Sequence, residues 1–137
     1  MNKIYIKNKI ISENSKPFFV AEMSGNHNQS LEMAFKIVKE AYKAGADAIK
    51  LQSYSAENMT LNISKPDFVI QDKKSPWYGM KLYDLYKKAA TPKCWFEKIY
   101  KYAKKIGIIC FSSVFDVETV KFLEKIGNPI YKISSFE

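Results

Sequence analysis

The chain has 137 residues, of which 47% are apolar, so it can form one domain, or part of one, around a single hydrophobic core. All 22 basic residues are lysines and the formal net charge is +8; since nucleic-acid readers rely heavily on arginine, we expect an anionic substrate and no nucleic-acid partner. No apolar run is long enough for a signal peptide or a bilayer span, so we expect a cytoplasmic protein without a membrane partner.

Residues 1–14 alternate isoleucine with lysine and asparagine, which predicts a short β-hairpin ahead of the main fold. The apolar run at residues 18–21 predicts a first strand. Ser30 has the position of an N-cap for the following helix, and Gly45 has the position of the residue that ends it. The main fold therefore opens with a strand followed by a helix.

The same strand and helix unit repeats along residues 17–137. Further strands are predicted at residues 46–52, 108–111 and 130–133. Thr91-Pro92 and Asp116 are expected to start the helices that precede the last two strands. Strands that alternate with helices form a parallel sheet with crossover helices, so the fold class is α/β.

Two architectures fit this alternation, a doubly wound sheet and a closed barrel. The first strand-to-helix turn, residues 24–28, lacks the Gly-x-Gly-x-x-Gly pattern of a doubly wound dinucleotide fold. Polar residues at several strand ends favour the (β/α)8 TIM barrel, in which catalytic groups gather at one face. Because a complete barrel takes about 250 residues, residues 1–137 are expected to hold its first four strand–helix units, without its C-terminal half.

The segment 53–81 is much longer than an ordinary connection between a strand and a helix. It contains Tyr54, Trp77 and Tyr78 and leads into a predicted short helix at residues 82–86. In a barrel, a connection at this position lies over the active face. We therefore expect a lid or an interface element.

Lys50 and Lys132 each lie near the end of a predicted isoleucine-containing strand. A lysine in such a strand is costly unless its charge is paired or used, although it could also extend outward between helices. Carboxylates, an amide and hydroxyls share the same predicted strand ends: Glu22, Gln52, Ser113, Ser135 and Glu137. This set of groups suits an anionic, oxygen-rich substrate.

His27 is the single histidine, so no metal site with two histidines can form within this chain. A lone loop histidine is more often a hydrogen-bonding residue than a metal ligand. The two cysteines, Cys94 and Cys110, lack metal-type spacing and are expected to be free thiols.

Four segments, at residues 21–28, 44–52, 111–116 and 131–137, resemble in order the motifs of the N-acetylneuraminate (sialic acid) synthase family. Residues 77–79 and 82–86 resemble the pseudaminic acid synthase branch of that family more than its neuraminate branch. The resemblance covers nearly the whole chain. It implies the N-terminal half of a TIM-barrel enzyme, with the later strands and a small C-terminal domain outside residues 1–137.

The implied reaction is carried out by a phosphoenolpyruvate-dependent transferase of nonulosonate biosynthesis. It joins phosphoenolpyruvate to a 2,4-diacetamido-2,4,6-trideoxy hexose, giving a nine-carbon sialic-acid-like sugar and phosphate. The family also implies a divalent metal, Mn²⁺ or Mg²⁺, whose histidine ligands lie beyond residue 137, and a homodimer.

The resemblance also implies roles for individual residues by motif position. Glu22, Gln52 and Glu137 would be catalytic, the latter two near the metal, the sugar or the attacking water. Phosphoenolpyruvate would be bound by Lys50, Ser113, Lys132 and Ser135. Asn26, His27 and Tyr83 would belong to the sugar-binding loops.

Three alternatives remain open from the sequence. The acceptor could be that of an N-acetylneuraminate or legionaminate synthase. Lys50 or Lys132 could form a Schiff base, as in lysine-dependent barrel aldolases. The chain could also be a catalytically incomplete half-barrel that acts only within an assembly, and we expect residues 1–137 alone to be inactive.

Overall fold

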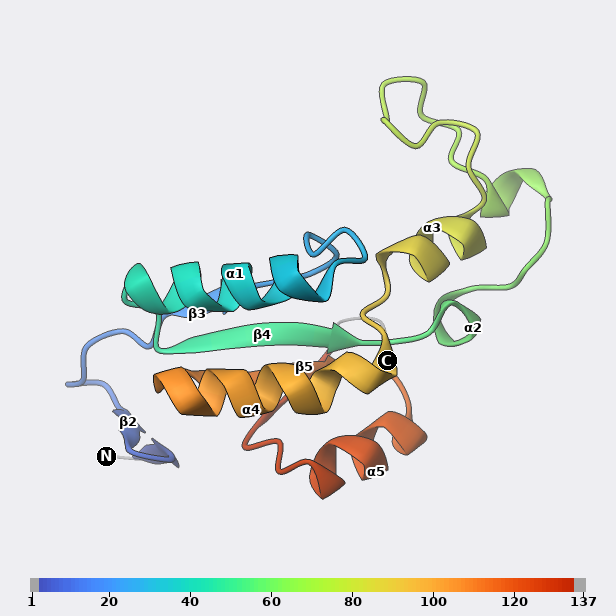
Figure 1. Ribbon diagram of the computed structural model, residues 1–137. Helices are drawn as coiled ribbons and strands as arrows, with labels where there is room; N and C mark the ends of the chain where they lie inside the picture. Colours follow the sequence, from blue (N-terminus) through green and yellow to red (C-terminus); the bar gives the residue numbers. More distant parts are fainter. Residues whose placement is uncertain (1–2, 135–137) are drawn as a thin grey trace.

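The computed structural model describes residues 3–134 of the chain (Figure 1). An antiparallel hairpin, β1 (Ile4–Ile6) and β2 (Lys9–Ile11), precedes the main sheet, as predicted. The main sheet contains four parallel strands in the order in which they occur in the chain. They are β3 (Val20–Glu22), β4 (Ala48–Ser53), β5 (Ile109–Val114) and β6 (Tyr131–Ile133). A doubly wound sheet reverses its strand order, so this sequential order is the one expected of the first half of a barrel.

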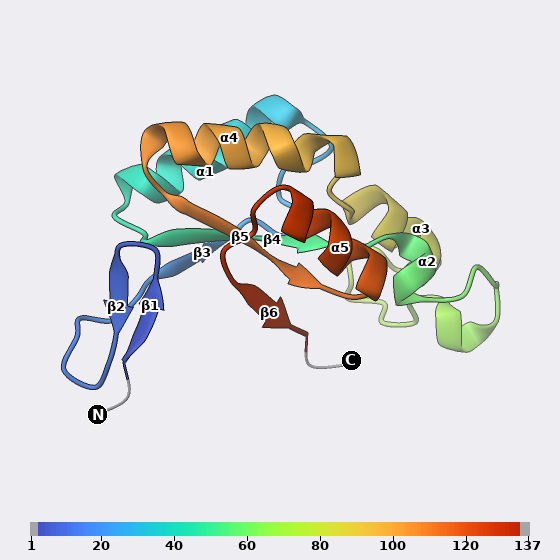
Figure 2. The same ribbon diagram turned by 90° about the horizontal axis from the view of Figure 1, so that it is seen from below.

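Three helices cover one face of this sheet: α1 (Leu31–Lys43), α4 (Phe96–Ile106) and α5 (Val117–Lys125) (Figure 2). The predicted caps of α1 and α5 are present. The Ser30 side chain accepts a hydrogen bond from the Met33 N–H at 3.2 Å, and Asp116 accepts one from the Thr119 N–H at 2.7 Å. None of the helices in residues 3–134 is long and apolar enough to cross a bilayer.

The two faces of the sheet contact different apolar clusters. Ile49, Leu51 and Cys110 point toward the helices and pack with Ile99 and Leu123 in the larger core. The opposite face, here called the inner face, carries a smaller cluster formed by Ala48, Ile109 and Phe111 with Ile6 of the hairpin. The hairpin therefore covers the amino-terminal part of the inner face and leaves polar residues on the carboxyl-terminal part.

The long connection after β4 contains structure of its own. It holds α2 (Ala56–Met59), the 3₁₀ turn η1 (Pro66–Phe68) and α3 (Leu82–Ala89). One antiparallel bridge, between Val69 and Lys81, closes its outer part. Figure 1 shows this segment extending beyond the carboxyl end of β4 and away from the sheet.

Several element boundaries differ from the prediction. The third predicted strand continues through Ser112 and Ser113 to Val114, because both serines are buried and the Ser112 hydroxyl bonds to the Leu51 carbonyl at 3.1 Å. Polar residues are tolerated inside a strand when neighbouring groups satisfy them. The helix predicted to start at Thr91-Pro92 begins with a 3₁₀ turn, η2 (Lys93–Trp95), before α4.

Candidate active site

Two rows of side chains cross the inner face near the carboxyl ends of the strands. In the first row, Glu22 of β3 is in register with Lys50 of β4, which is in register with Phe111 of β5. In the second row, Gln52, Ser113 and Lys132 are in register on β4, β5 and β6. Since side chains alternate between the faces of a sheet, both rows share the face of Ala48 and Phe111.

Lys50 and Glu22 form an ion pair within the first row. The Lys50 side chain is 18% exposed and that of Glu22 is 40% exposed, so the pair lies at the surface of the inner face. The charge of this strand lysine is therefore paired, and the side chain does not extend between the outer helices. The pair places a cation and a carboxylate directly beside the second row.

The second row combines three kinds of hydrogen-bond donor. Gln52 is partly buried, Ser113 is buried and Lys132 is exposed. An amide, a hydroxyl and an ammonium group are all donors that suit phosphate or carboxylate oxygens. Sequence-predicted residues from three strands are therefore brought together by the sheet register.

Ser24, which the sequence did not single out, joins this site from the turn after β3. Its hydroxyl donates a hydrogen bond to Gln52 Oε1 at 3.0 Å. The backbone φ of Ser24 is +49°, in the left-handed region that costs a non-glycine residue about 1 kcal/mol. From the sequence, Ser24 could have been found only because it lies two residues after the predicted site residue Glu22.

The predicted loop residue His27 is buried, with 0% exposure. Its Nδ1 accepts a hydrogen bond from the Gln29 N–H at 3.1 Å, so Nε2 carries the proton and donates to Thr91 Oγ1 at 3.0 Å. The Trp95 ring packs edge-on against it. Burial lowers the pKa of His27. We propose that His27 fixes the turn after β3 to the start of η2 instead of contacting the sugar.

The two other predicted loop residues have partners within the chain. Asn26 is exposed, and its side-chain amide donates to the Met23 carbonyl at 3.0 Å. Tyr83 of α3 donates to Glu57 Oε1 of α2 at 2.5 Å, which lowers the pKa of Glu57 to about 2 and raises that of Tyr83. Two further predicted site residues, Ser135 and Glu137, lie outside the described residues.

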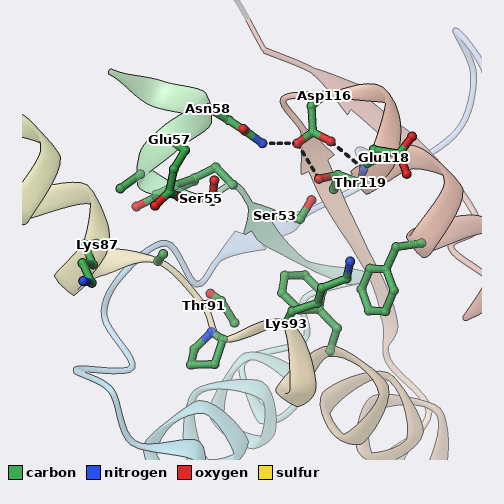
Figure 3. Close-up of a pocket in the computed structure, with 16 residues that line it drawn as sticks. Ser53, Ser55, Glu57, Asn58, Lys87, Thr91, Lys93, Asp116, Glu118 and Thr119 are labelled. Carbon is green, nitrogen blue, oxygen red and sulfur yellow. Dashed lines mark hydrogen bonds between the residues drawn. The ribbon is translucent and has the colours of Figure 1, made fainter. Parts of the chain in front are cut away.

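A cavity of about 440 Å³ lies at the carboxyl ends of β4 and β5, between α2, η2 and α5 (Figure 3). Phe96 and Phe122 form part of its apolar wall, and polar groups such as Thr91 and Lys93 surround it. On one side Asn58 donates to Asp116 at 2.5 Å. The residues of the two rows do not line this cavity, so it is separate from the candidate active site.

The described residues do not form a metal site. Residues 3–134 contain no cluster of three or more histidine, cysteine, aspartate or glutamate side chains that could hold an ion. His27 is committed to Gln29 and Thr91. The family resemblance places the histidine ligands of its divalent cation beyond residue 137, so we derive no reaction step through that cation here.

Comparison with known proteins agrees with this geometry. The NeuB family model matches residues 37–137. A pseudaminic acid synthase of Campylobacter jejuni is 51% identical over 122 residues, covering 89% of this chain and 35% of the relative. One from Helicobacter pylori is 41% identical over 121 residues, covering 88% of this chain and 35% of the relative.

An N,N'-diacetyllegionaminic acid synthase of Campylobacter jejuni is more distant, at 31% identity over 126 residues, covering 89% of this chain and 36% of the relative. Among solved structures, a sialic acid synthetase of Leptospira borgpetersenii in complex with citrate matches with a TM-score of 0.78 and 30% identity. That match covers 96% of this chain and 41% of the Leptospira chain.

The chain thus spans about 35% of the length of the curated relatives that it matches. The family model covers most of the chain, and the parallel sheet has the strand order of a TIM-barrel half. The family resemblance and the barrel fold expected from the sequence are both confirmed. This chain belongs to the NeuB family.

Proposed function

We propose that these residues supply the phosphoenolpyruvate-binding part of a pseudaminic acid synthase-like active site. The observation that carries the proposal is the second row, Gln52, Ser113 and Lys132, in register beside the Glu22–Lys50 pair. Neighbouring strands lie about 4.8 Å apart, so three strands span about 10 Å. This distance suits a small molecule with a carboxylate at one end and a phosphate at the other.

The chemistry asks for charge compensation and orientation. The enol carbon of phosphoenolpyruvate attacks the aldehyde carbon of the open-chain sugar, so a carbon–carbon bond forms between them. Water supplies the new ketone oxygen, and phosphate leaves. Fixing an anionic nucleophile beside an aldehyde turns an encounter of two molecules into a reaction within one complex.

Each residue has a proposed role in this scheme. Lys132 and Ser113 bind anionic oxygens of phosphoenolpyruvate, and Lys50 adds a second cation from the neighbouring row. Glu22 holds Lys50 before the substrate binds and handles a proton afterwards. An amine that is paired with a carboxylate is a poor nucleophile, so the Lys50 pair does not favour a Schiff-base mechanism at this residue.

The wider proposal concerns the complete enzyme. It includes a 2,4-diacetamido-2,4,6-trideoxy hexose as acceptor, Mn²⁺ or Mg²⁺ held by residues outside this chain, a homodimer, and activity in the cytoplasm. The identities of 51% and 41% with pseudaminic acid synthases support this acceptor over that of a legionaminate or neuraminate synthase. Residues 1–137 alone are proposed to be inactive, because they hold only part of the site.

The test uses the natural full-length polypeptide that carries this sequence. Phosphate release and the mass of the sugar product are measured with phosphoenolpyruvate and, in parallel, with the acceptor sugars of pseudaminic acid, legionaminate and N-acetylneuraminate synthases. We expect phosphate release with the 2,4-diacetamido-2,4,6-trideoxyaltrose acceptor. If none of the three acceptors gives phosphate release, the synthase proposal is contradicted.

A lysine pair tests the site itself. Lys132→Met removes a charged donor from the row, and a lost hydrogen bond to a charged group costs about 1.5–3 kcal/mol, so the KM for phosphoenolpyruvate should rise about 10- to 150-fold. Lys98→Met removes an exposed lysine from α4 and should leave the KM unchanged. Equal effects of the two substitutions would show that the row does not bind the substrate.

A further inference from the structure

The turn after β3 uses a serine where its backbone favours a glycine. Ser24 has a φ of +49°, in the left-handed region in which glycine carries no steric penalty. The glycine that follows is explained by packing: a Cβ at Gly25 would lie 3.2 Å from both the Cβ and the carbonyl oxygen of Ala89. The serine at position 24 needs a different explanation, which its side chain supplies.

The Ser24 hydroxyl faces Gln52 because the pairing of β3 with β4 continues into the turn. The Met23 N–H donates to the Lys50 carbonyl at 3.0 Å, which places the next residue beside the end of β4. From there Ser24 donates to Gln52 Oε1 at 3.0 Å. The hydrogen bond therefore holds the oxygen end of the Gln52 carboxamide.

We infer that Ser24 is a positioning residue that fixes the orientation of the Gln52 carboxamide, so that Gln52 Nε2 donates to the anionic substrate. This inference rests on the proposed function. Gln52 is in register with Ser113 and Lys132, so a directed Nε2 completes a row of three donors.

The physical reason is the near-equal shape of the two ends of a carboxamide. A carboxamide without a fixed partner can rotate so that its oxygen, an acceptor, faces the substrate oxygens, which are also acceptors. The Ser24 hydroxyl donates to Oε1, and this arrangement holds the oxygen end against the turn and leaves Nε2 as the end directed to the substrate. The strained serine backbone is then the cost of keeping that hydroxyl in place.

The kinetic test uses Ser24→Gly, Gln52→Ala and the double variant in the natural full-length polypeptide. Ser24→Gly removes the hydroxyl and also relieves the backbone, two effects on stability that oppose each other, so we expect a nearly unchanged Tm together with an approximately tenfold higher KM for phosphoenolpyruvate. If Ser24 had only a structural role, its replacement would not raise the KM while the Tm stays nearly unchanged. If Ser24 acts through Gln52, the double variant has the same KM as Gln52→Ala.

A second measurement does not depend on turnover. NMR of the full-length polypeptide with labelled glutamine side chains follows the Gln52 carboxamide, whose signals are assigned by their loss in Gln52→Ala, and Gln29 and Gln71 serve as internal controls. Ser24→Gly should shift the Gln52 side-chain carbonyl signal, and phosphoenolpyruvate should shift the Gln52 Nε2 signal of the unmodified protein. The signals of Gln29 and Gln71 should not change.

The outcomes separate the inference from the proposed function. Suppose that the protein is inactive but its Gln52 carbonyl signal still depends on Ser24. The hydrogen bond between the two residues is then present, whereas the synthase proposal and the substrate assigned to Gln52 Nε2 are contradicted. An active protein in which Ser24→Gly leaves both the KM and the Gln52 signals unchanged overturns the inference. Additive effects on KM in the double variant overturn it as well.

Discussion

Acidification is expected to destabilise this protein through His27. The side chain is 0% exposed, and its Nδ1 accepts the Gln29 N–H, so a proton added there would meet another donor. Burial lowers the pKa of His27 below its ordinary value of 6.5, so the unfolded chain binds this proton more readily than the folded one. Stability from the neutral ring is therefore complete above pH 6.5 and is lost as the pH falls below it.

The size of the effect follows from linkage. If the ring stays neutral in the folded protein, the free energy of unfolding falls by up to about 1.4 kcal/mol per pH unit below the unfolded pKa. Between pH 7.5 and 5.5 the expected loss is at most about 1.4 kcal/mol, because only the unit between pH 6.5 and 5.5 lies below the unfolded pKa. Carboxylates titrate mainly below this range.

Urea unfolding of the full chain at several pH values measures this loss. His27→Gln supplies the control, because glutamine can reach Thr91 but does not titrate. The variant should be less stable at pH 7.5, by about 1 kcal/mol for an imperfectly replaced hydrogen bond, and its stability should be flat down to pH 5.5. Parallel pH curves for the unmodified protein and the variant would refute the assignment of the effect to His27.

Three further results are expected from the packing. Gly25→Ala should lower the free energy of unfolding by about 1–3 kcal/mol, because the new Cβ would lie 3.2 Å from Ala89 at the end of α3. An unchanged urea midpoint would show that α3 can move away from the new methyl group at little cost. Leu123→Ala, at a fully buried site, should lower the free energy of unfolding by about 2–5 kcal/mol. Val117→Ala on the same helix, at a site that is 69% exposed, should change it by less than about 0.5 kcal/mol. Similar urea midpoints for the two variants would contradict the assigned core. Cys94 is exposed, and Cys110 is buried with a raised thiol pKa, so a thiol reagent should label Cys94 in the folded protein and Cys110 only in denaturant. Rapid labelling of Cys110 in the folded state would argue against this burial.

Local signals in the sequence were sufficient to predict the repeating units. Ser30 and Asp116 cap their helices as expected, because an N-cap depends on the side chain and on backbone groups a few residues away. The end of β5 was placed too early because Ser112 and Ser113 look like loop residues in isolation. Their burial depends on β4, which lies about sixty positions earlier in the chain.

The sequence also predicted which residue types gather at the strand ends, but not how they pair. Glu22 with Lys50, and Gln52 with Ser113 and Lys132, are consequences of register, which is a property of two or more strands together. His27 illustrates the same difference: its isolation in the sequence suggested a hydrogen-bonding residue, and only the packed structure supplied Thr91 as its partner.

The sequence by itself therefore determined the α/β class, the parallel order of units and the family, because periodicity, caps and motifs are carried by neighbouring residues. Only the tertiary structure decided that Lys50 is paired, that His27 is buried and that Ser24 holds Gln52. These three facts depend on side chains separated by 28 or more positions along the chain. Strand register and backbone conformation bring them into contact, and neither is encoded in any one segment.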